Sequence, residues 1–216
     1  MDFEDSAHRR PLNRPLGEPA RGGMKARRSF ADRAVLITGA AGSIGAGLAR
    51  EIAALGCRRL CLVDHFDHGL LAITDELRHR YPHLRVDDAL CDVRSAARLG
   101  RTFADFRPDI VLHAAALKHV HLGESHPGEC VLTNLVGVRN AARAAQASGA
   151  ETFLLVSSDK AASPVCTMGV SKRLAELYVQ GLARTAERAG AATRFKIVRF
   201  GNVYGSQGSV VPKFLA

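Results

Sequence analysis

The sequence contains no tryptophan, and only 6% of its residues are aromatic. It also lacks any apolar run that approaches the roughly 20 residues needed to span a bilayer. Asp2, Glu4 and Asp5 stand where a secretory signal peptide needs a positive region followed by an apolar stretch. The lack of a long apolar run and the acidic amino terminus argue against a membrane-spanning or exported protein, and we expect a cytoplasmic chain without a transmembrane segment.

Cysteine is scarce and shows no pairing pattern. The chain has five cysteines, an odd number, and no CxxC pair. Such thiols are typical of a reduced compartment, where most cysteines act as small apolar residues. His119, His121 and His126 lie near one another, but no second group of cysteine, histidine or acidic residues occurs at ligand spacing. We therefore expect reduced thiols and no metal site.

Positive charges exceed negative charges by nine, yet no basic run is interleaved with aromatic residues as a nucleic-acid-binding groove requires. A phosphate-bearing small molecule explains this excess as well as DNA does, and we expect no nucleic-acid partner. Residues 1–30 are rich in proline, glycine and arginine and show no apolar periodicity. This composition predicts a mobile basic leader.

From residue 31 onward, short β-branched apolar runs alternate with amphipathic stretches. The alternation is typical of consecutive βαβ units and predicts one α/β domain over 31–216, with a doubly wound parallel sheet of the Rossmann type. Helices are expected to stop at Gly56, Gly149 and Gly190. The expected strands cover 34–38, 60–64, 85–90, 110–114, 153–157 and 195–200, and the expected helices cover 44–55, 70–80, 96–106, 130–147 and 171–189.

The turn after the first expected strand reads TGAAGSIG over 38–45. Glycines at this spacing allow a tight turn, let backbone N–H groups approach a pyrophosphate, and let the helix pack closely on the strand. Glycine turns also occur as plain structural stops, but the position between a strand and an amphipathic helix favours a dinucleotide site. We expect Gly39, Gly42, Ser43, Ile44 and Gly45 to bind a nicotinamide dinucleotide.

Two acidic residues follow neighbouring expected strands. Asp64 ends the second strand, where a carboxylate can accept hydrogen bonds from the adenosine ribose and repel a 2′-phosphate. It favours NAD over NADP, although the basic residues at 58, 59 and 65 could offset it, and the alternative is a solvated loop acid. Asp92, followed by Val93, could meet the adenine amino group or could cap the helix that begins at residue 96.

The loop after the fourth expected strand is rich in small residues. Ala114 and Ala115 would let a cofactor lie close to the backbone. Lys118 could touch a phosphate or a sugar hydroxyl, or it could be an exposed loop lysine.

Ser158, Asp159 and Lys160 follow the fifth expected strand, at the carboxyl edge where open α/β sheets place their ligands. Their hydroxyl, carboxylate and ammonium groups suit proton transfer, although an ordinary helix-entry turn would use Ser158 or Asp159 only as a cap. Met168 and Lys172 stand one helical turn apart, so both should face the same cleft. Lys172 could hold a nicotinamide ribose there.

The motifs TGAAGSIG, LHAAALKHV, SSDKAASP, MGVSKRLAE and RFGNVYGSQGSVVP resemble, in this order, the capsule and flagellar polysaccharide group of extended short-chain dehydrogenases. That group contains UDP-N-acetylglucosamine 4,6-dehydratases and related epimerases. The resemblance runs from about residue 34 to residue 212. It implies a UDP-N-acetylhexosamine substrate and a homo-oligomer, and it suggests NADP as the cofactor where Asp64 favours NAD.

The resemblance also implies roles for single residues. Hydride would leave carbon-4 of the sugar for the nicotinamide, water would be lost across carbons 5 and 6, and hydride would return at carbon-6. Ser158 would bind the carbon-4 hydroxyl, Asp159 would protonate the departing carbon-6 hydroxyl, and Lys160 would be the carbon-5 base. Asn134 and Asn202 would hold cofactor or substrate, and Gly208, Ser209 and Val210 would lie near the nucleotide diphosphate.

The sequence departs from that family in two respects. Met168 replaces the tyrosine of the usual YxxxK, and a thioether cannot remove a hydroxyl proton. Another group, Lys172 acting through water, would then have to take it. Members of the family also continue well beyond GSVVP into a smaller substrate-binding part, so that part is expected to be largely missing. Two alternatives to the dehydratase stay open: a UDP-sugar 4- or 5-epimerase, and a truncated dinucleotide-binding module without catalysis.

Overall fold

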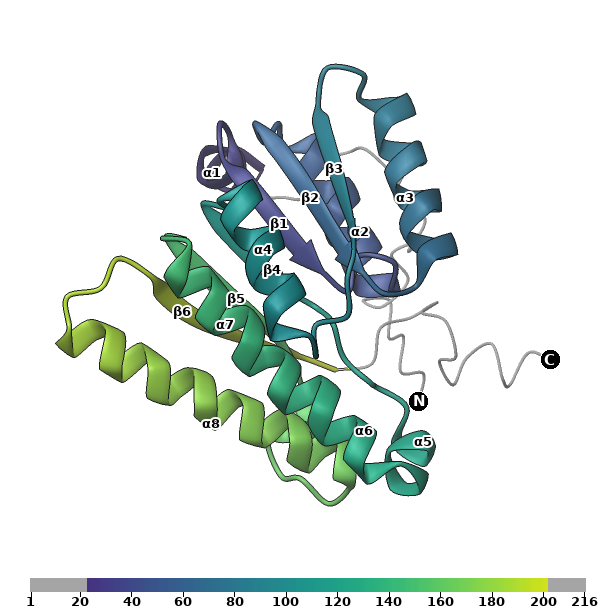
Figure 1. The fold of residues 1–216 in the computed structure, drawn as a ribbon, viewed down its shortest axis with the longest axis vertical. Helices are drawn as coiled ribbons and strands as arrows, with labels where there is room; N and C mark the ends of the chain where they lie inside the picture. The colour runs from purple at the N-terminus through teal and green to yellow at the C-terminus, as the bar shows by residue number, and fades with distance from the viewer. Residues whose placement is uncertain (1–22, 202–216) are drawn as a thin grey trace, which may run out of the picture.

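The computed structural model describes residues 23–201, which form one sheet with helices on both faces (Figure 1). All neighbouring strands pair in parallel, in the order β3-β2-β1-β4-β5-β6. The α/β, doubly wound Rossmann-type fold predicted from the sequence is therefore confirmed. The strands are β1 (Ala34–Thr38), β2 (Arg59–Asp64), β3 (Arg85–Leu90), β4 (Ile110–His113), β5 (Thr152–Ser158) and β6 (Arg194–Phe200).

Helices cover the two faces of the sheet unequally. Helices α2 (Ser43–Ala54) and α3 (Asp67–Arg80) pack on one face. Helices α4 (Ala96–Phe106), α7 (Gly137–Ala147) and α8 (Thr167–Arg188) pack on the other. Every residue of β1 is buried, because this central strand is covered on both sides and needs an unbroken apolar run.

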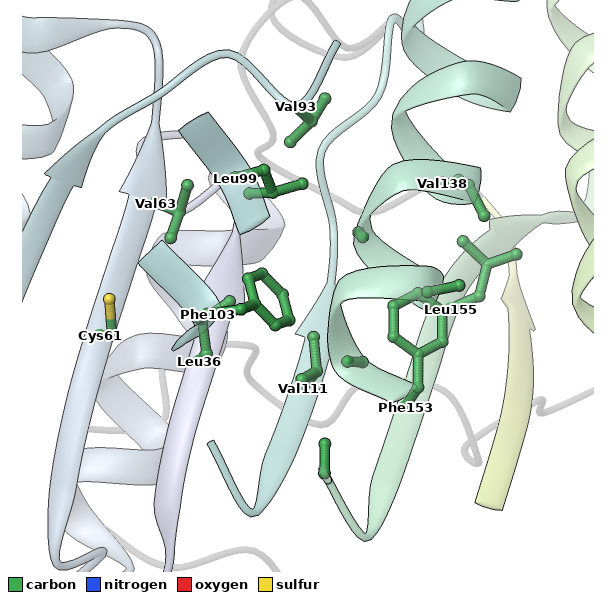
Figure 2. Packing of buried hydrophobic residues seen from close by; sticks show 14 of the residues in the cluster. Leu36, Cys61, Val63, Val93, Leu99, Phe103, Val111, Val138, Phe153 and Leu155 are labelled. Atoms are coloured by element: carbon green, nitrogen blue, oxygen red, sulfur yellow. The ribbon is translucent and has the colours of Figure 1, made fainter. Parts of the chain in front are cut away.

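The larger core cluster lies between the sheet and α4, α7 and α8 (Figure 2). Phe103 from α4 and Phe153 from β5 are its largest fully buried side chains. Burial of one such side chain contributes about 1.5–3 kcal/mol. The cluster holds the two halves of the sheet, β1-β2-β3 and β4-β5-β6, against common helices.

The glycine stops are confirmed. Gly56, Gly149 and Gly190 have φ values of +81°, +77° and +63°, a region that residues with a Cβ rarely adopt. Each follows the last turn of α2, α7 or α8 within three residues. The four buried cysteines (Cys57, Cys61, Cys91 and Cys130) and the half-buried Cys166 are free thiols.

Several elements differ from the sequence predictions. The expected leader over 1–30 ends in a helix, α1 (Gly23–Phe30), whose Phe30 packs against the core, and residues 1–22 lie outside the described residues. Two short helices, α5 (Val120–Ser125) and α6 (Pro127–Val131), precede a π-helical turn, η1 (Leu132–Val136), within the predicted helix 130–147. A single 3-10 turn, η2 (Asp159–Ala161), follows β5.

Helix α8 begins four residues earlier than the apolar periodicity predicts. The Glu124 carboxylate of α5 accepts hydrogen bonds from the Thr167 backbone N–H at 2.7 Å and from the Thr167 hydroxyl at 3.1 Å. A carboxylate at a helix amino end stabilises the first turn, and this one comes from a residue distant in sequence. Among residues 23–201, no helix is long and apolar enough to cross a bilayer.

Candidate functional site

The turn between β1 and α2 has a shape that requires glycine. Gly39 has a φ of +71°, and a Cβ there would lie 2.5 Å from the Ala115 backbone nitrogen. A Cβ at Gly45 would overlap the Gly39 carbonyl oxygen. Gly42 precedes α2 and provides no side-chain cap for the helix that Ser43 and Ile44 begin. A helix amino end of this kind favours an anionic group such as a phosphate.

Two adjoining cavities open at the carboxyl edge of the sheet, on either side of this turn. We call them the lysine cavity, of about 320 Å³, and the aspartate cavity, of about 340 Å³. Gly39, Gly42 and the loop after β4 line both cavities. The lysine cavity is also lined by Ser43, Ile44, Gly45, Lys118, Ser158, Lys160, Met168 and Lys172, and the aspartate cavity by Asp64, Asp92, Val93, Arg94, Ala115 and Glu129.

Asp64 links the end of β2 to the glycine turn. Its Oδ2 accepts a hydrogen bond from the Ala41 backbone N–H at 2.9 Å, and its Oδ1 accepts from the N–H groups of His65 and Phe66 at 2.8 and 3.0 Å. The residue is only 8% exposed. The alternative of a solvated loop acid is therefore wrong, and the carboxylate is a fixed negative charge on the wall of the aspartate cavity.

Asp92 does not cap α4. The helix begins after Ser95 without a side-chain cap, whereas Asp92 accepts hydrogen bonds from the backbone and guanidinium of Arg94. These hydrogen bonds from Arg94 outweigh burial and lower the pKa of the Asp92 carboxyl. Arg94 also pairs with Glu129 of α6 at 2.6 Å, while the Asn140 amide donates to the carbonyl of Val93. The wall of the aspartate cavity that contains Asp92 and Val93 is therefore held to α6 by an ion pair and to α7 by a hydrogen bond.

Asn134 supports the loop between the two cavities and does not line either one. This fully buried residue of the π-helical turn accepts a hydrogen bond from the Leu117 N–H at 2.8 Å and donates one to the Leu117 carbonyl at 2.9 Å. It also donates to the Ser171 hydroxyl of α8. The direct contact with cofactor or substrate expected for Asn134 does not fit this geometry, because its amide is engaged with protein groups.

Ala114, Ala115 and Lys118 lie on the loop that Asn134 supports. Ala114 lines both cavities, Ala115 lines the aspartate cavity, and Lys118 lines the lysine cavity. Ala115 also lies against Gly39, where any side chain on the glycine would collide with its backbone. A flat ligand in either cavity would therefore meet backbone atoms and methyl groups on this side.

Ser158, Asp159 and Lys160 are brought together by the turn η2. The Ser158 hydroxyl donates to Asp159 Oδ1 at 2.9 Å, and the Lys160 ammonium donates to the same oxygen at 3.3 Å. The hydrogen bonds from Ser158 and Lys160 lower the pKa of the Asp159 carboxyl. Ser158 also accepts a hydrogen bond from the Lys160 N–H, so the capping alternative holds together with the position at the cavity. Ser158 and Lys160 line the lysine cavity, and Asp159 stands beside it.

Met168 and Lys172 line the lysine cavity from the first two turns of α8. Both are buried, at 4% exposure each. The Lys172 ammonium donates to the Val156 carbonyl at 2.7 Å. Burial lowers the pKa of Lys172 to about 8, although the negative charge of Glu176 opposes this shift.

His113 lies beneath the site at the end of β4. It is fully buried, its Nδ1 lies 2.7 Å from the Thr38 hydroxyl, and its ring stacks on Phe153. Its Nε2 has no hydrogen-bond partner among the described residues. Burial, together with the positive charge of Lys172, lowers the pKa of His113 to about 3.

Sequence reasoning missed several residues of the site. The buried Glu176 was detectable, because it follows Lys172 by one helical turn, but Asn140, Arg94 and Glu129 carry no local signal. Within the described part of the chain, no group of three or more His, Cys, Asp or Glu residues could hold a metal. Asn202, Gly208, Ser209 and Val210 lie outside the described residues.

Comparisons with known proteins agree with this geometry. The polysaccharide biosynthesis protein family matches residues 35–216. The chain is 41% identical over 183 residues to the probable polysaccharide biosynthesis protein EpsC of Bacillus subtilis, covering 84% of this chain and 30% of that protein. It is 34% identical both to a UDP-N-acetylglucosamine 4,6-dehydratase (inverting) of Campylobacter jejuni and to a UDP-glucose 4-epimerase of Rickettsia bellii, covering 86% of this chain and 53% of each relative.

Among solved structures, Pen from Bacillus thuringiensis is similar, with a TM-score of 0.79 and 31% identity over 86% of this chain and 55% of that one. The chain therefore spans a third to about half of the length of these relatives. The family match covers almost all the described residues, including both cavities. The chain belongs to the polysaccharide biosynthesis protein family.

Proposed function

We propose that this chain is the dinucleotide-binding part of a nucleotide-sugar dehydratase or epimerase, and that its specific reaction is the 4,6-dehydration of UDP-N-acetylglucosamine. The observation that supports this most directly is the junction of two cavities over the glycine turn. One cavity has carboxylates on its wall, as suits an adenosine, and the other gathers three lysines and three serines, as suits the reacting sugar.

The residues present fit a nicotinamide dinucleotide, which would supply a transient hydride acceptor. Gly39, Gly42 and Gly45 leave room for the pyrophosphate, because side chains there would fill the turn or approach its backbone. Asp64 and Asp92 would hold the adenosine, and Lys172 the nicotinamide ribose. Replacing Gly42 with Asp places bulk and negative charge where the phosphate should approach, and we expect Gly42→Asp to abolish cofactor uptake in calorimetric titration.

We propose NAD as the preferred cofactor. The Asp64 carboxylate is fixed by three backbone N–H groups and would repel a ribose 2′-phosphate. Arg94 offsets little of this repulsion of a 2′-phosphate, because its guanidinium is paired with Asp92 and Glu129. We expect NAD to bind about tenfold more tightly than NADP, a difference of about 1.4 kcal/mol.

Calorimetric titration with both oxidised cofactors tests this preference. Asp64→Asn should narrow the difference in affinity between NAD and NADP. The matched control Asp67→Asn, on the exposed first turn of α3, should leave that difference unchanged. Tighter binding of NADP would contradict the preference for NAD. Absence of uptake of either cofactor would contradict the proposed function itself.

The lining of the lysine cavity supports the proton-transfer roles that we propose. Met168 cannot accept a proton, whereas Lys172 is buried and its pKa is lowered to about 8, so we assign removal of the carbon-4 hydroxyl proton, through a water, to Lys172. Ser158 would hold that hydroxyl. The hydrogen bonds from Ser158 and Lys160 hold Asp159 as a carboxylate. We therefore assign removal of the carbon-5 proton and protonation of the departing hydroxyl to the Asp159–Lys160 pair together, and not one step to each residue separately. The net product lost is water.

Incubation of the protein with UDP-N-acetylglucosamine and NAD, followed by mass spectrometry, tests the reaction. Dehydration lowers the product mass by one water, and Lys160→Ala should remove this product while cofactor affinity is retained. Epimerisation leaves the mass unchanged, and it is the second candidate because the epimerase relative is as similar as the dehydratase relative. Cofactor uptake without turnover of any UDP-sugar would select the non-catalytic binding module.

A further inference from the structure

Glu176 is a carboxylate buried at the base of the site. It is 1% exposed and has three partners. The Ser157 hydroxyl donates to its Oε1 at 2.6 Å, Arg199 of β6 donates to both oxygens at 2.7 and 2.5 Å, and Arg173 donates to Oε2 at 3.1 Å. One negative charge therefore meets two positive charges, and the group carries a net positive charge.

This group is adjacent to Lys172. Glu176 follows Lys172 by one turn on α8, and its partner Ser157 follows Val156, whose carbonyl accepts the Lys172 hydrogen bond. The negative charge of Glu176 favours the ammonium form of Lys172 and so raises its pKa. Charged or titratable groups near Lys172 on the packed elements are His113 on β4, Lys118 and His119 on the loop after β4, Asp159 and Lys160 in η2, Arg173 and Glu176 on α8, and Arg199 on β6.

We propose that Arg199 and Arg173 are positioning residues that act on Lys172 through Glu176, by compensating its charge so that Lys172 can exchange a proton in the lysine cavity. The inference rests on the proposed function, which gives the proton exchange at Lys172 its role. The effect of the charges on the pKa of Lys172 can be measured in the cofactor-free chain.

The sign of the effect follows from the charges. An uncompensated carboxylate beside Lys172 would stabilise the ammonium and keep the lysine protonated. Because Arg199 and Arg173 hold the carboxylate with charge-assisted hydrogen bonds, much of that stabilisation is cancelled. The same hydrogen bonds outweigh the effect of burial on Glu176 and lower the pKa of its carboxyl to about 2, so the negative charge is present throughout the working pH range.

A merely structural role makes a different prediction. If the cluster only held β6 against α8, its removal would loosen the packing and expose Lys172 to water. Every variant would then move the pKa of Lys172 upward toward its ordinary value of 10.5. Charge compensation instead requires that removal of the carboxylate and removal of an arginine shift this pKa in opposite directions.

The test is an NMR titration of the cofactor-free chain labelled with ¹³C-lysine. The chain has six lysines, and the Lys172 signal is assigned by its loss in Lys172→Met. Glu176→Gln should lower the pKa of Lys172, and Arg199→Gln should raise it, each by about half a unit or more. Arg173→Gln, which removes the longer and single hydrogen bond, should raise it by less and is the gentler variant if Arg199→Gln does not fold.

Arg50→Gln is the matched control. Arg50 also forms a two-bond pair with a glutamate of another element, Glu76 of α3, but neither residue lines the lysine cavity. Arg50→Gln should cost less stability, because both partners of this pair are about one-third exposed, and it should leave the pKa of Lys172 unchanged. Opposite shifts in the Glu176 and arginine variants support the proposal. A rise in Glu176→Gln, or no change in both arginine variants, overturns it, and neither result depends on sugar turnover.

Discussion

Acidification should destabilise the fold through His113. In the unfolded chain this side chain binds a proton below its ordinary pKa of 6.5, whereas in the folded chain burial lowers the pKa to about 3. The stability is therefore fully present above pH 6.5 and is lost as the pH falls toward 3. Linkage with these two values gives a loss of about 2 kcal/mol between pH 7 and pH 5. Such a loss is a large part of the stability of a typical domain.

Urea unfolding of the wild type and of His113→Asn at pH 7 and pH 5 measures this loss of unfolding free energy on acidification. The asparagine amide keeps a polar partner for Thr38, and the variant should lose about 2 kcal/mol less than the wild type on acidification. His83→Asn, at an exposed position before β3, is the matched control and should behave as the wild type does. An equal pH dependence in wild type and His113→Asn would refute the assignment of a neutral, buried imidazole.

Two further predictions concern the walls of the cavities. Asn134→Ala leaves both backbone groups of Leu117 without their partner and should lower the free energy of unfolding by about 2–4 kcal/mol in urea denaturation; an unchanged midpoint would show that the loop does not depend on this amide. Gly39→Ala should prevent stable folding in circular dichroism melts, because its φ is positive and the new methyl group would collide with Ala115. Gly47→Ala, inside helix α2 with open space around it, should instead be neutral or slightly stabilising, and equal melting of the two variants would contradict the steric argument.

The sheet and the glycine turn were predictable because their signals are local. The run 34–37 is apolar at every position, as a strand covered on both faces requires, and the glycines at 39, 42 and 45 follow shortly after it. Gly56, Gly149 and Gly190 similarly mark helix ends through their own backbone freedom. Each of these features depends on a few consecutive residues.

The features that escaped prediction depend on contacts between distant residues. The early start of α8 requires Glu124, which lies on another helix. The role of Asn134 requires Leu117, and the identification of Glu176 as an anion requires Arg199 from β6. No periodicity contains this information. The predicted family resemblance pointed to the correct loops, but it could not show that Asn134 faces the protein and that Asp159 stands beside the cavity.

The pairing of β1 with β4 has a consequence for how the protein acquires its binding site. These strands are neighbours in the sheet, yet about a third of the chain separates them in sequence. The crevice over Gly39 and Ala115 exists only after the two βαβ halves have docked, which is a long-range and therefore late folding event. A bound dinucleotide would bridge that seam and oppose its opening, so protection of the β1 and β4 amides from hydrogen exchange would report ligand occupancy.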